Sequence, residues 1–251
     1  MNLARHLVES RLAGEVATTR GSTRENCRKM VEGRPDYTFG LSDWRDTTVE
    51  EALDAIRALC GGDPTAGAPD DPGWIEPDAA MKAIERHRQR LAAFASNGDG
   101  RVLLATGHPT GLLSHYGAIA RALGAHGCRL LTPLDDRWID HDWRDRTLGI
   151  RYLDDVACVT DGGSLRHTHR GVFMEAMLDE LEEPPDLVVG DHGMAGAAIE
   201  RGIPTLSIAD VNDPALPVAQ QRGRTDAVLP IDDNLSPRLF VPVTHAMLDW
   251  S

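Results

Sequence analysis

Carboxylate side chains follow two apolar segments in the C-terminal half of the chain. Asp191 and His192 come directly after DLVVG, and Asp210, Asn212 and Asp213 come directly after TLSIA. Carboxylates and an amide are ligands that Mg²⁺ or Mn²⁺ prefers, and a histidine beside them also suits Fe²⁺ or Zn²⁺. Crowded carboxylates raise one another's pKa unless a cation compensates them. These five residues are therefore predicted to bind a divalent metal, the alternative being that they cap and pack the following helices.

Three further histidines have a spacing that suits proton transfer. His167 and His169 lie at i and i+2 in DGGSLRHTH, which places both on one face of an extended strand, and His108 lies in TGHPTG. With Asp161, which opens the first of these segments, they are predicted to be catalytic, and His108 or His167 is the expected proton carrier. The alternative is that they are ordinary surface histidines.

The segment around His108 also has the composition of an anion-binding turn. It lies between an apolar run and a helical stretch, where free backbone N–H groups at a helix start can bind phosphate. Its glycines permit close backbone approach. Thr106, Gly107, Thr110 and Gly111 are therefore predicted to contact phosphate, although an ordinary strand-to-helix turn would look the same.

Three arginines recur every fourth residue near the N-terminus of an acidic chain. Arg20, Arg24 and Arg28 would form one basic stripe on a helix, and the chain's net charge is −13. Because guanidinium groups bind phosphate well, Arg20 and Arg24 are predicted to bind the substrate. Solvated salt bridges with the acidic body of the protein are the alternative.

The elements that must position these residues fall into two parts. Residues 99–251 alternate short apolar runs with helical stretches, which predicts an α/β domain with a mostly parallel, Rossmann-like sheet. Polar clusters end nearly every apolar run, so they are expected to meet at the carboxyl edge of that sheet. Residues 1–98 show no strand periodicity and are predicted to form a helical N-terminal subdomain.

Several helix boundaries can be predicted in the N-terminal part. Leu3, Leu7, Leu12 and Val16 have roughly helical spacing, and Ser22 with Glu25 resembles a capping box at the start of a second helix. Helices are also expected at 49–60 and 77–96. The segment 61–73 between them is rich in glycine and proline, which is typical of a lid or a linker.

Composition and charge exclude several classes of protein. The chain has 26 Lys and Arg against 39 Asp and Glu, without a basic block, so nucleic acid is not an expected partner. Its four cysteines lack CxxC spacing, which argues against a zinc knuckle or a disulfide framework. No signal-like or membrane-spanning apolar run occurs, so a cytoplasmic protein without membrane attachment is expected. The oligomeric state stays open.

The longer motifs resemble a family of actinobacterial phosphatases. The segments that carry the resemblance are TDGGSLRHTH, GDHGMAGAA, ADVNDPAL and PIDDN, together with LAGEVATTR and REN near the N-terminus. The resemblance spans most of the chain and implies phosphoester hydrolysis.

The residues and the resemblance together favour a metal-dependent phosphatase that acts on a small phosphorylated metabolite. Two alternatives remain: a sugar-phosphate or nucleotide binding protein without turnover, and a metal-assisted hydrolase or isomerase of another anionic substrate. The crowd of carboxylates favours turnover, because a binding protein needs little more than one phosphate site.

Overall fold

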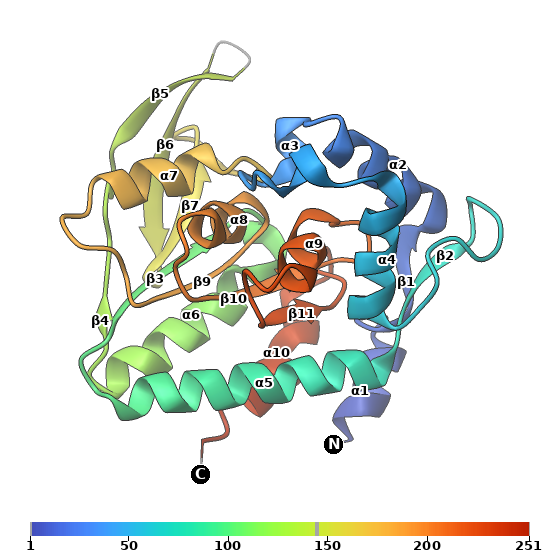
Figure 1. Cartoon of the computed structure of the whole chain (residues 1–251). Helices are drawn as coiled ribbons and strands as arrows, with labels where there is room; N and C mark the ends of the chain where they lie inside the picture. Colours follow the sequence, from blue (N-terminus) through green and yellow to red (C-terminus); the bar gives the residue numbers. More distant parts are fainter. Residues whose placement is uncertain (1, 144–145, 251) are drawn as a thin grey trace.

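The computed structural model describes residues 2–143 and 146–250, and within them a nine-stranded sheet forms the centre of the protein (Figure 1). From one edge to the other the strands are β11 (Val228–Pro230), β10 (Thr205–Ala209), β9 (Leu187–Asp191), β3 (Arg101–Thr106), β7 (Val156–Thr160), β6 (Arg146–Leu153) and β5 (Trp138–Trp143), with β4 (Arg129–Leu130) beside β3 and β8 (Leu165–Arg166) beside β7. The strands from β11 to β7 run parallel, and β6 pairs antiparallel with both β7 and β5. The predicted mostly parallel α/β fold is confirmed.

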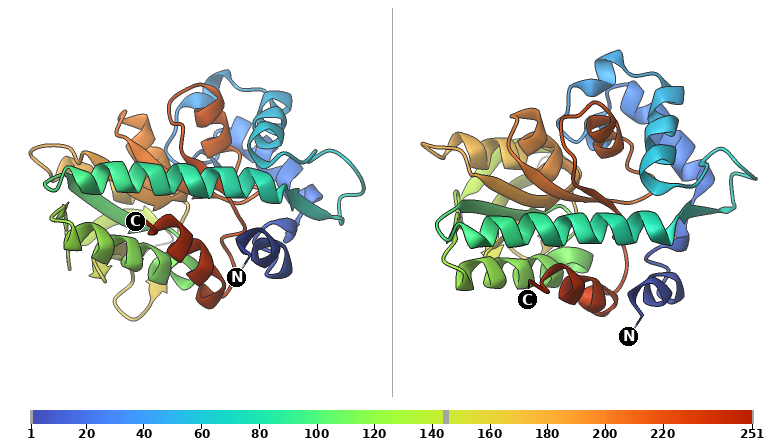
Figure 2. Two further views of the ribbon diagram at one scale, coloured as in Figure 1. Left: turned by 90° about the horizontal axis from the view of Figure 1, so that it is seen from below. Right: turned by 60° about the horizontal axis from the view of Figure 1, so that its bottom comes forward.

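Helices cover both faces of this sheet (Figures 1 and 2). Val102 and Leu104 of β3 belong to one hydrophobic cluster, whereas Leu103 and Ala105 belong to another, as expected for side chains that alternate between faces. One face carries α5 (Pro77–Ser96), α6 (Pro109–Ala125) and α10 (Pro237–Met247), and the other carries α7 (Val172–Asp179), α8 (His192–Glu200) and α9 (Ala215–Gln221). The central strands are buried on both sides, which explains their unbroken apolar sequences.

The N-terminal part contains two strands that the sequence did not indicate. Its elements are α1 (Leu3–Glu9), β1 (Gly14–Thr19), α2 (Arg20–Val31), α3 (Pro35–Thr38), the 3-10 helix η1 (Asp43–Asp46), α4 (Val49–Cys60) and β2 (Pro72–Ile75). β1 and β2 pair antiparallel, so the expectation of helices and loops alone was wrong. Arg11 and Gly14 have positive φ, which ends α1 and turns the chain into β1 before Val16.

Helix boundaries follow local capping chemistry. The predicted ranges of α4 and α5 are confirmed, and Thr48 with Glu51 forms a capping box at the start of α4. α2 begins earlier than predicted, because Thr19 and not Ser22 is the N-cap, and the Thr19 hydroxyl accepts the Ser22 N–H at 3.2 Å. No helix in the described ranges is both long and apolar enough to cross a membrane.

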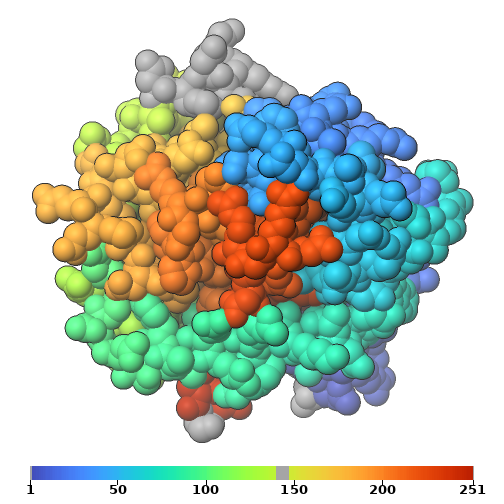
Figure 3. Space-filling model, viewed as in Figure 1, coloured from blue at the N-terminus to red at the C-terminus, as the bar shows by residue number. Residues whose placement is uncertain are grey.

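The two parts of the chain share a hydrophobic core. Leu7, Ile56 and Leu91 lie in the same buried cluster as Leu104 and Phe240. In the space-filling view the blue N-terminal segments lie directly against the orange-red segment that carries α9 (Figure 3), in agreement with the packing of α4 on α9. The division of the chain at residue 98 into two folding units remains a prediction.

Candidate active site

The polar clusters at the strand ends meet where the chain reverses its direction of progress across the sheet. After β3 the chain forms β5, β6 and β7 on one side of β3. It then crosses over and forms β9, β10 and β11 on the other side of β3. Such a switch point leaves a crevice at the carboxyl ends of the two strands beside it, here β3 and β9. His108 follows β3, and Asp191 is the last residue of β9.

His192 occupies a tight junction between β9 and α8. Its φ is +46°, in the left-handed region that non-glycine residues rarely adopt. A Cβ on Gly193 would lie 2.3–2.5 Å from backbone atoms of residues 169–171, so only glycine lets that segment pass so closely. As a result the rings of His169 and His192 stack, with centroids 4.2 Å apart and planes 8° from parallel.

Asp191 holds the His192 ring by a hydrogen bond. The Asp191 Oδ2 atom lies 2.7 Å from Nδ1 of His192 and also accepts the Gly107 N–H at 3.0 Å. When Nδ1 carries the proton, Nε2 of His192 presents a lone pair to the other side of the ring. Burial raises the pKa of Asp191 and holds the pKa of His192 well below its usual range, so this histidine is neutral.

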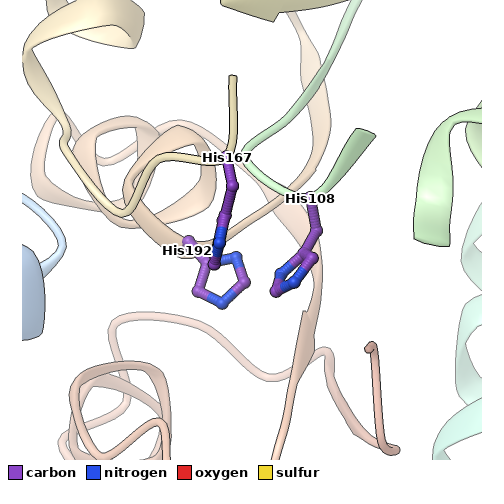
Figure 4. Close-up of side chains that lie close together, drawn as sticks. All are labelled: His108, His167 and His192. Carbon is purple, nitrogen blue, oxygen red and sulfur yellow. The ribbon is translucent and has the colours of Figure 1, made fainter. Parts of the chain in front are cut away.

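Three histidine rings converge from different parts of the fold (Figure 4). His108 and His167 have ring centroids 3.9 Å apart, and His108 and His192 have centroids 5.0 Å apart. One ring nitrogen of each lies within 4.8 Å of those of the other two. Burial lowers the pKa values of His108 and His167 to about 4, although His167 is partly exposed to solvent. His169 lies beside this group, and its Nδ1 is 3.0 Å from the Asp36 carbonyl oxygen.

Four buried carboxylates lie on the other side of His192: Asp210, Asp213, Asp232 and Asp233. Nε2 of His192 is 3.5 Å from Oδ2 of Asp213 and 3.4 Å from Oδ2 of Asp233. Burial raises the pKa of Asp210 to about 7, with a smaller contribution from Asp232. Burial and the neighbouring carboxylates also raise the pKa values of Asp213 and Asp233 well above their usual range. Among the described residues no Lys or Arg forms an ion pair with these four carboxylates.

The N-terminal strand β1 completes the carboxylate group. The Thr18 hydroxyl donates to Oδ2 of Asp210, and the Ala17 N–H donates to Oδ2 of Asp232 at 3.3 Å. Asn212, a predicted metal ligand, lies between β10 and α9, but its side-chain amide donates to the Ser22 hydroxyl of α2 at 3.3 Å. The sequence predictions did not select Thr18, Asp232 or Asp233, although the strand-end rule pointed to PIDDN.

The predicted phosphate-binding turn, residues 106–111, packs against the residues of this site. The Thr106 hydroxyl accepts the His108 N–H at 2.9 Å, and the Gly107 N–H is donated to Asp191. A Cβ on Gly111 would lie 2.4 Å from the Asp233 carbonyl oxygen, so this glycine allows α6 to approach Asp233. Thr110 is exposed in the first turn of α6. A phosphate contact of this turn remains a prediction.

The structure does not bring Arg20, Arg24 and Asp161 into the cluster. Arg20 donates to the Asp63 carbonyl, and Arg24 donates to the carbonyls of residues 64, 65 and 67, so both arginines hold the segment between α4 and β2. Asp161 accepts the backbone N–H groups of residues 163 and 164 and forms a turn beyond β7. Their predicted roles in binding and catalysis remain predictions.

A small cavity opens beside the histidines. It has a volume of about 190 Å³ and is lined by Asp36, His167, Thr168 and His169. It gives the cluster a route from solvent that passes the exposed ring of His167.

Comparison with known proteins defines the class to which this arrangement belongs. The chain matches a family described as phosphatases over residues 1–251. The protein therefore belongs to this phosphatase family and is a hydrolase. It is similar to the phosphatase SCO2771 of Streptomyces coelicolor, with 37% identity over 254 residues that cover 98% of this chain and 94% of the relative. The predicted membership of an actinobacterial phosphatase family is confirmed.

Proposed function

We propose that this phosphatase is a metal-dependent phosphomonoesterase that acts on a small phosphorylated metabolite. The observation that carries the proposal is the group of four buried carboxylates, Asp210, Asp213, Asp232 and Asp233, without an arginine or lysine partner in the described part of the chain. Several buried like charges are costly unless they are protonated or bound to a cation. Oxygen ligands of this kind suit Mg²⁺ or Mn²⁺, and Fe²⁺ or Zn²⁺ become possible if His192 joins them.

Unpartnered polar atoms support the fit of an ion. Among the described residues, Oδ2 of Asp233 and Nδ1 of His108 are buried and have no hydrogen-bond partner, whereas most buried polar atoms in proteins have one. When bound, a divalent ion would polarise the phosphoryl group and lower the pKa of a water molecule.

The side chains around the carboxylates have complementary tasks in this proposal. Asp191 fixes the ring orientation and the tautomer of His192, as carboxylates do for metal-binding histidines. His108 is neutral, so it can accept a proton from an attacking water molecule. The ring of His167 lies against that of His108, tilted by 34°, and His167 lines the cavity, so it can pass that proton to solvent.

The size of the entrance supports a small substrate. A cavity of about 190 Å³ has room for a phosphoryl group with a small substituent. Membership of a phosphatase family disfavours the alternative of a binding protein without turnover.

Hydrolysis of p-nitrophenyl phosphate after dialysis against EDTA tests the proposal. We expect activity to disappear and to return with Mn²⁺ or Mg²⁺. Asp191→Asn and Asp210→Asn should each lower activity by at least about 100-fold, the effect of losing a ligand or the group that orients one. Asp155→Asn is the matched control, because Asp155 lies in the exposed turn before β7, at the opposite end of that strand. Full activity after exhaustive dialysis would refute metal dependence.

A further inference from the structure

We propose that the protein binds a second, chemically different ion: a transition metal such as Zn²⁺ or Fe²⁺, held by His108, His167 and His192 together with Asp233. The ion of the proposed function would be held by Asp210, Asp213 and Asp232, and Asp233 would lie between the two. The binding of this second ion does not rest on the proposed function. When this ion is bound, the ring nitrogens of His108 and His167 serve as ligands, so the proton transfer proposed for them above belongs to the protein without this ion.

Ring nitrogens of two histidines face one carboxylate oxygen of Asp233. His192 uses its Nδ1 proton on Asp191, so its Nε2 is an acceptor, and it lies 3.4 Å from Oδ2 of Asp233. Nδ1 of His108 is 3.6 Å from the same oxygen, and both of these atoms are buried without a hydrogen-bond partner. Converging lone pairs need a cation or an added proton between them.

Two separations around Asp233 have the length expected in a tetrahedral metal site. Ligand atoms about 2.1 Å from a tetrahedral ion are separated from one another by roughly 3.4 Å. The separations of 3.4 Å and 3.6 Å about Oδ2 of Asp233 agree with this value. His167 provides the third nitrogen, since one ring nitrogen of each histidine lies within 4.8 Å of the others (Figure 4).

The surroundings prepare the histidines for binding. Three separate segments supply them: the N-cap position of α6, the segment after β8 and the first residue of α8. The hydrogen bond from Asp191 and the edge-on packing of Phe39 fix the ring of His192.

The two sites are expected to prefer different ions because their donor atoms differ. Imidazole nitrogen prefers Zn²⁺, Fe²⁺ or Co²⁺, whereas sites built from carboxylates prefer Mg²⁺ or Mn²⁺. The histidine site is therefore expected to retain a transition metal in the presence of excess Mg²⁺. The cavity beside His167 and His169 gives that ion a path from solvent.

Titration of the metal-free protein with Co²⁺ in excess Mg²⁺ tests this site, because Co²⁺ bound by several nitrogens in a four-coordinate site absorbs visible light strongly. We expect the first equivalent to give these bands. His167→Ala and His108→Ala should weaken Co²⁺ binding by at least about 10-fold. Asp232→Asn should leave the bands in place and reduce Mn²⁺ binding measured by calorimetry. His245→Ala, at an exposed position of α10, is the control.

The outcomes separate this inference from the proposed function. Equal Co²⁺ titrations of the wild-type protein and both histidine variants, or loss of the bands in excess Mg²⁺, would overturn the histidine site even if activity requires a metal. Bands that depend on His108 and His167 in an enzyme that keeps full activity without metal would support the site and overturn the proposed function.

Discussion

Replacing Asp210 by asparagine should change the stability of the protein in opposite directions with and without metal. Asp210 is buried beside Asp232, and burial together with this neighbour raises its pKa from 3.8 to about 7. Folding therefore favours the protonated form, so the metal-free protein loses stability as the pH rises from about 4 through 7. Asparagine cannot ionise and escapes this loss.

The expected size of the effect follows from the pKa shift. Raising the pKa from 3.8 to about 7 corresponds to ~4 kcal/mol at pH 7.5. Weaker hydrogen bonds with Thr18 and with the Val211 N–H should offset about 1–2 kcal/mol of this gain. The metal-free variant should thus be more stable by roughly 2–3 kcal/mol, which raises the melting temperature by about 5–10 °C in a protein of this size. An ion at 100 times its Kd would stabilise the wild type by ~2.7 kcal/mol and the variant by much less.

Thermal unfolding of protein dialysed against EDTA, with and without added Mn²⁺, measures both effects at pH 7.5. Asp155→Asn again serves as the matched control, because it removes one exposed carboxylate from the same sheet. A metal-free Asp210→Asn protein that melts below the wild type would refute the argument from crowded carboxylates. Equal stabilisation of both proteins by Mn²⁺ would refute the placement of the ion.

Three further perturbations address other parts of the structure. Gly111→Val places a side chain against the Asp233 carbonyl and must displace it, so Mn²⁺-dependent activity should fall at least about 10-fold. Arg24→Ala removes the donors that hold the segment between α4 and β2, so limited proteolysis there should accelerate while KM changes less than about twofold. His87→Gln should flatten the pH dependence of stability: burial lowers the pKa of His87 to about 4, so protonation of the unfolded chain below about pH 6.5 costs the wild type ~2 kcal/mol between pH 7 and pH 5.

Each of these perturbations has a control. Gly124→Val and His126→Gln lie at exposed positions on α6 and just after it. Arg57→Ala, on α4, is the control for KM alone, because Arg57 also contacts the segment between α4 and β2 through Asp63. Equal activity of the two valine variants would mean that Asp233 tolerates displacement. A raised KM in Arg24→Ala but not in Arg57→Ala would show that Arg24 binds the substrate. Parallel stability curves for the wild type and His87→Gln between pH 5 and pH 7 would show that His87 is not held neutral.

The sequence predicts the sheet well because its central strands are buried on both faces. β3, β9 and β10 are therefore mostly apolar along their length. β1 was missed because it begins at a glycine and is not buried on both faces, and because Val16 continued a helical spacing from Leu12. Propensity alone does not reveal a two-stranded pair between segments so far apart along the chain.

The candidate site was predicted in part for a similar reason. Strand ends in a parallel sheet must meet at one edge, and this rule alone brings Asp191, Asp210 and Asp213 together. The rule does not show which strand-end residues contact the histidines. It therefore left out Asp233, whose Oδ2 atom lies within 3.6 Å of ring nitrogens of two histidines. The arginine stripe shows the limit of spacing arguments: a period of four residues defines a helix face, but the partner of that face depends on tertiary structure.

The bonds from β1 to the carboxylates also set the order in which the protein can become active during synthesis. Thr18 and Asp210 are separated by 192 residues along the chain, and Ala17 and Asp232 by 215. The ribosome delivers β1 among the first elements, but its partners emerge only with β10 and after β11, the last strand. A nascent chain therefore carries an incomplete site for nearly the whole of translation. Polypeptides released early, by stalling or by cleavage before β11, should have no hydrolase activity.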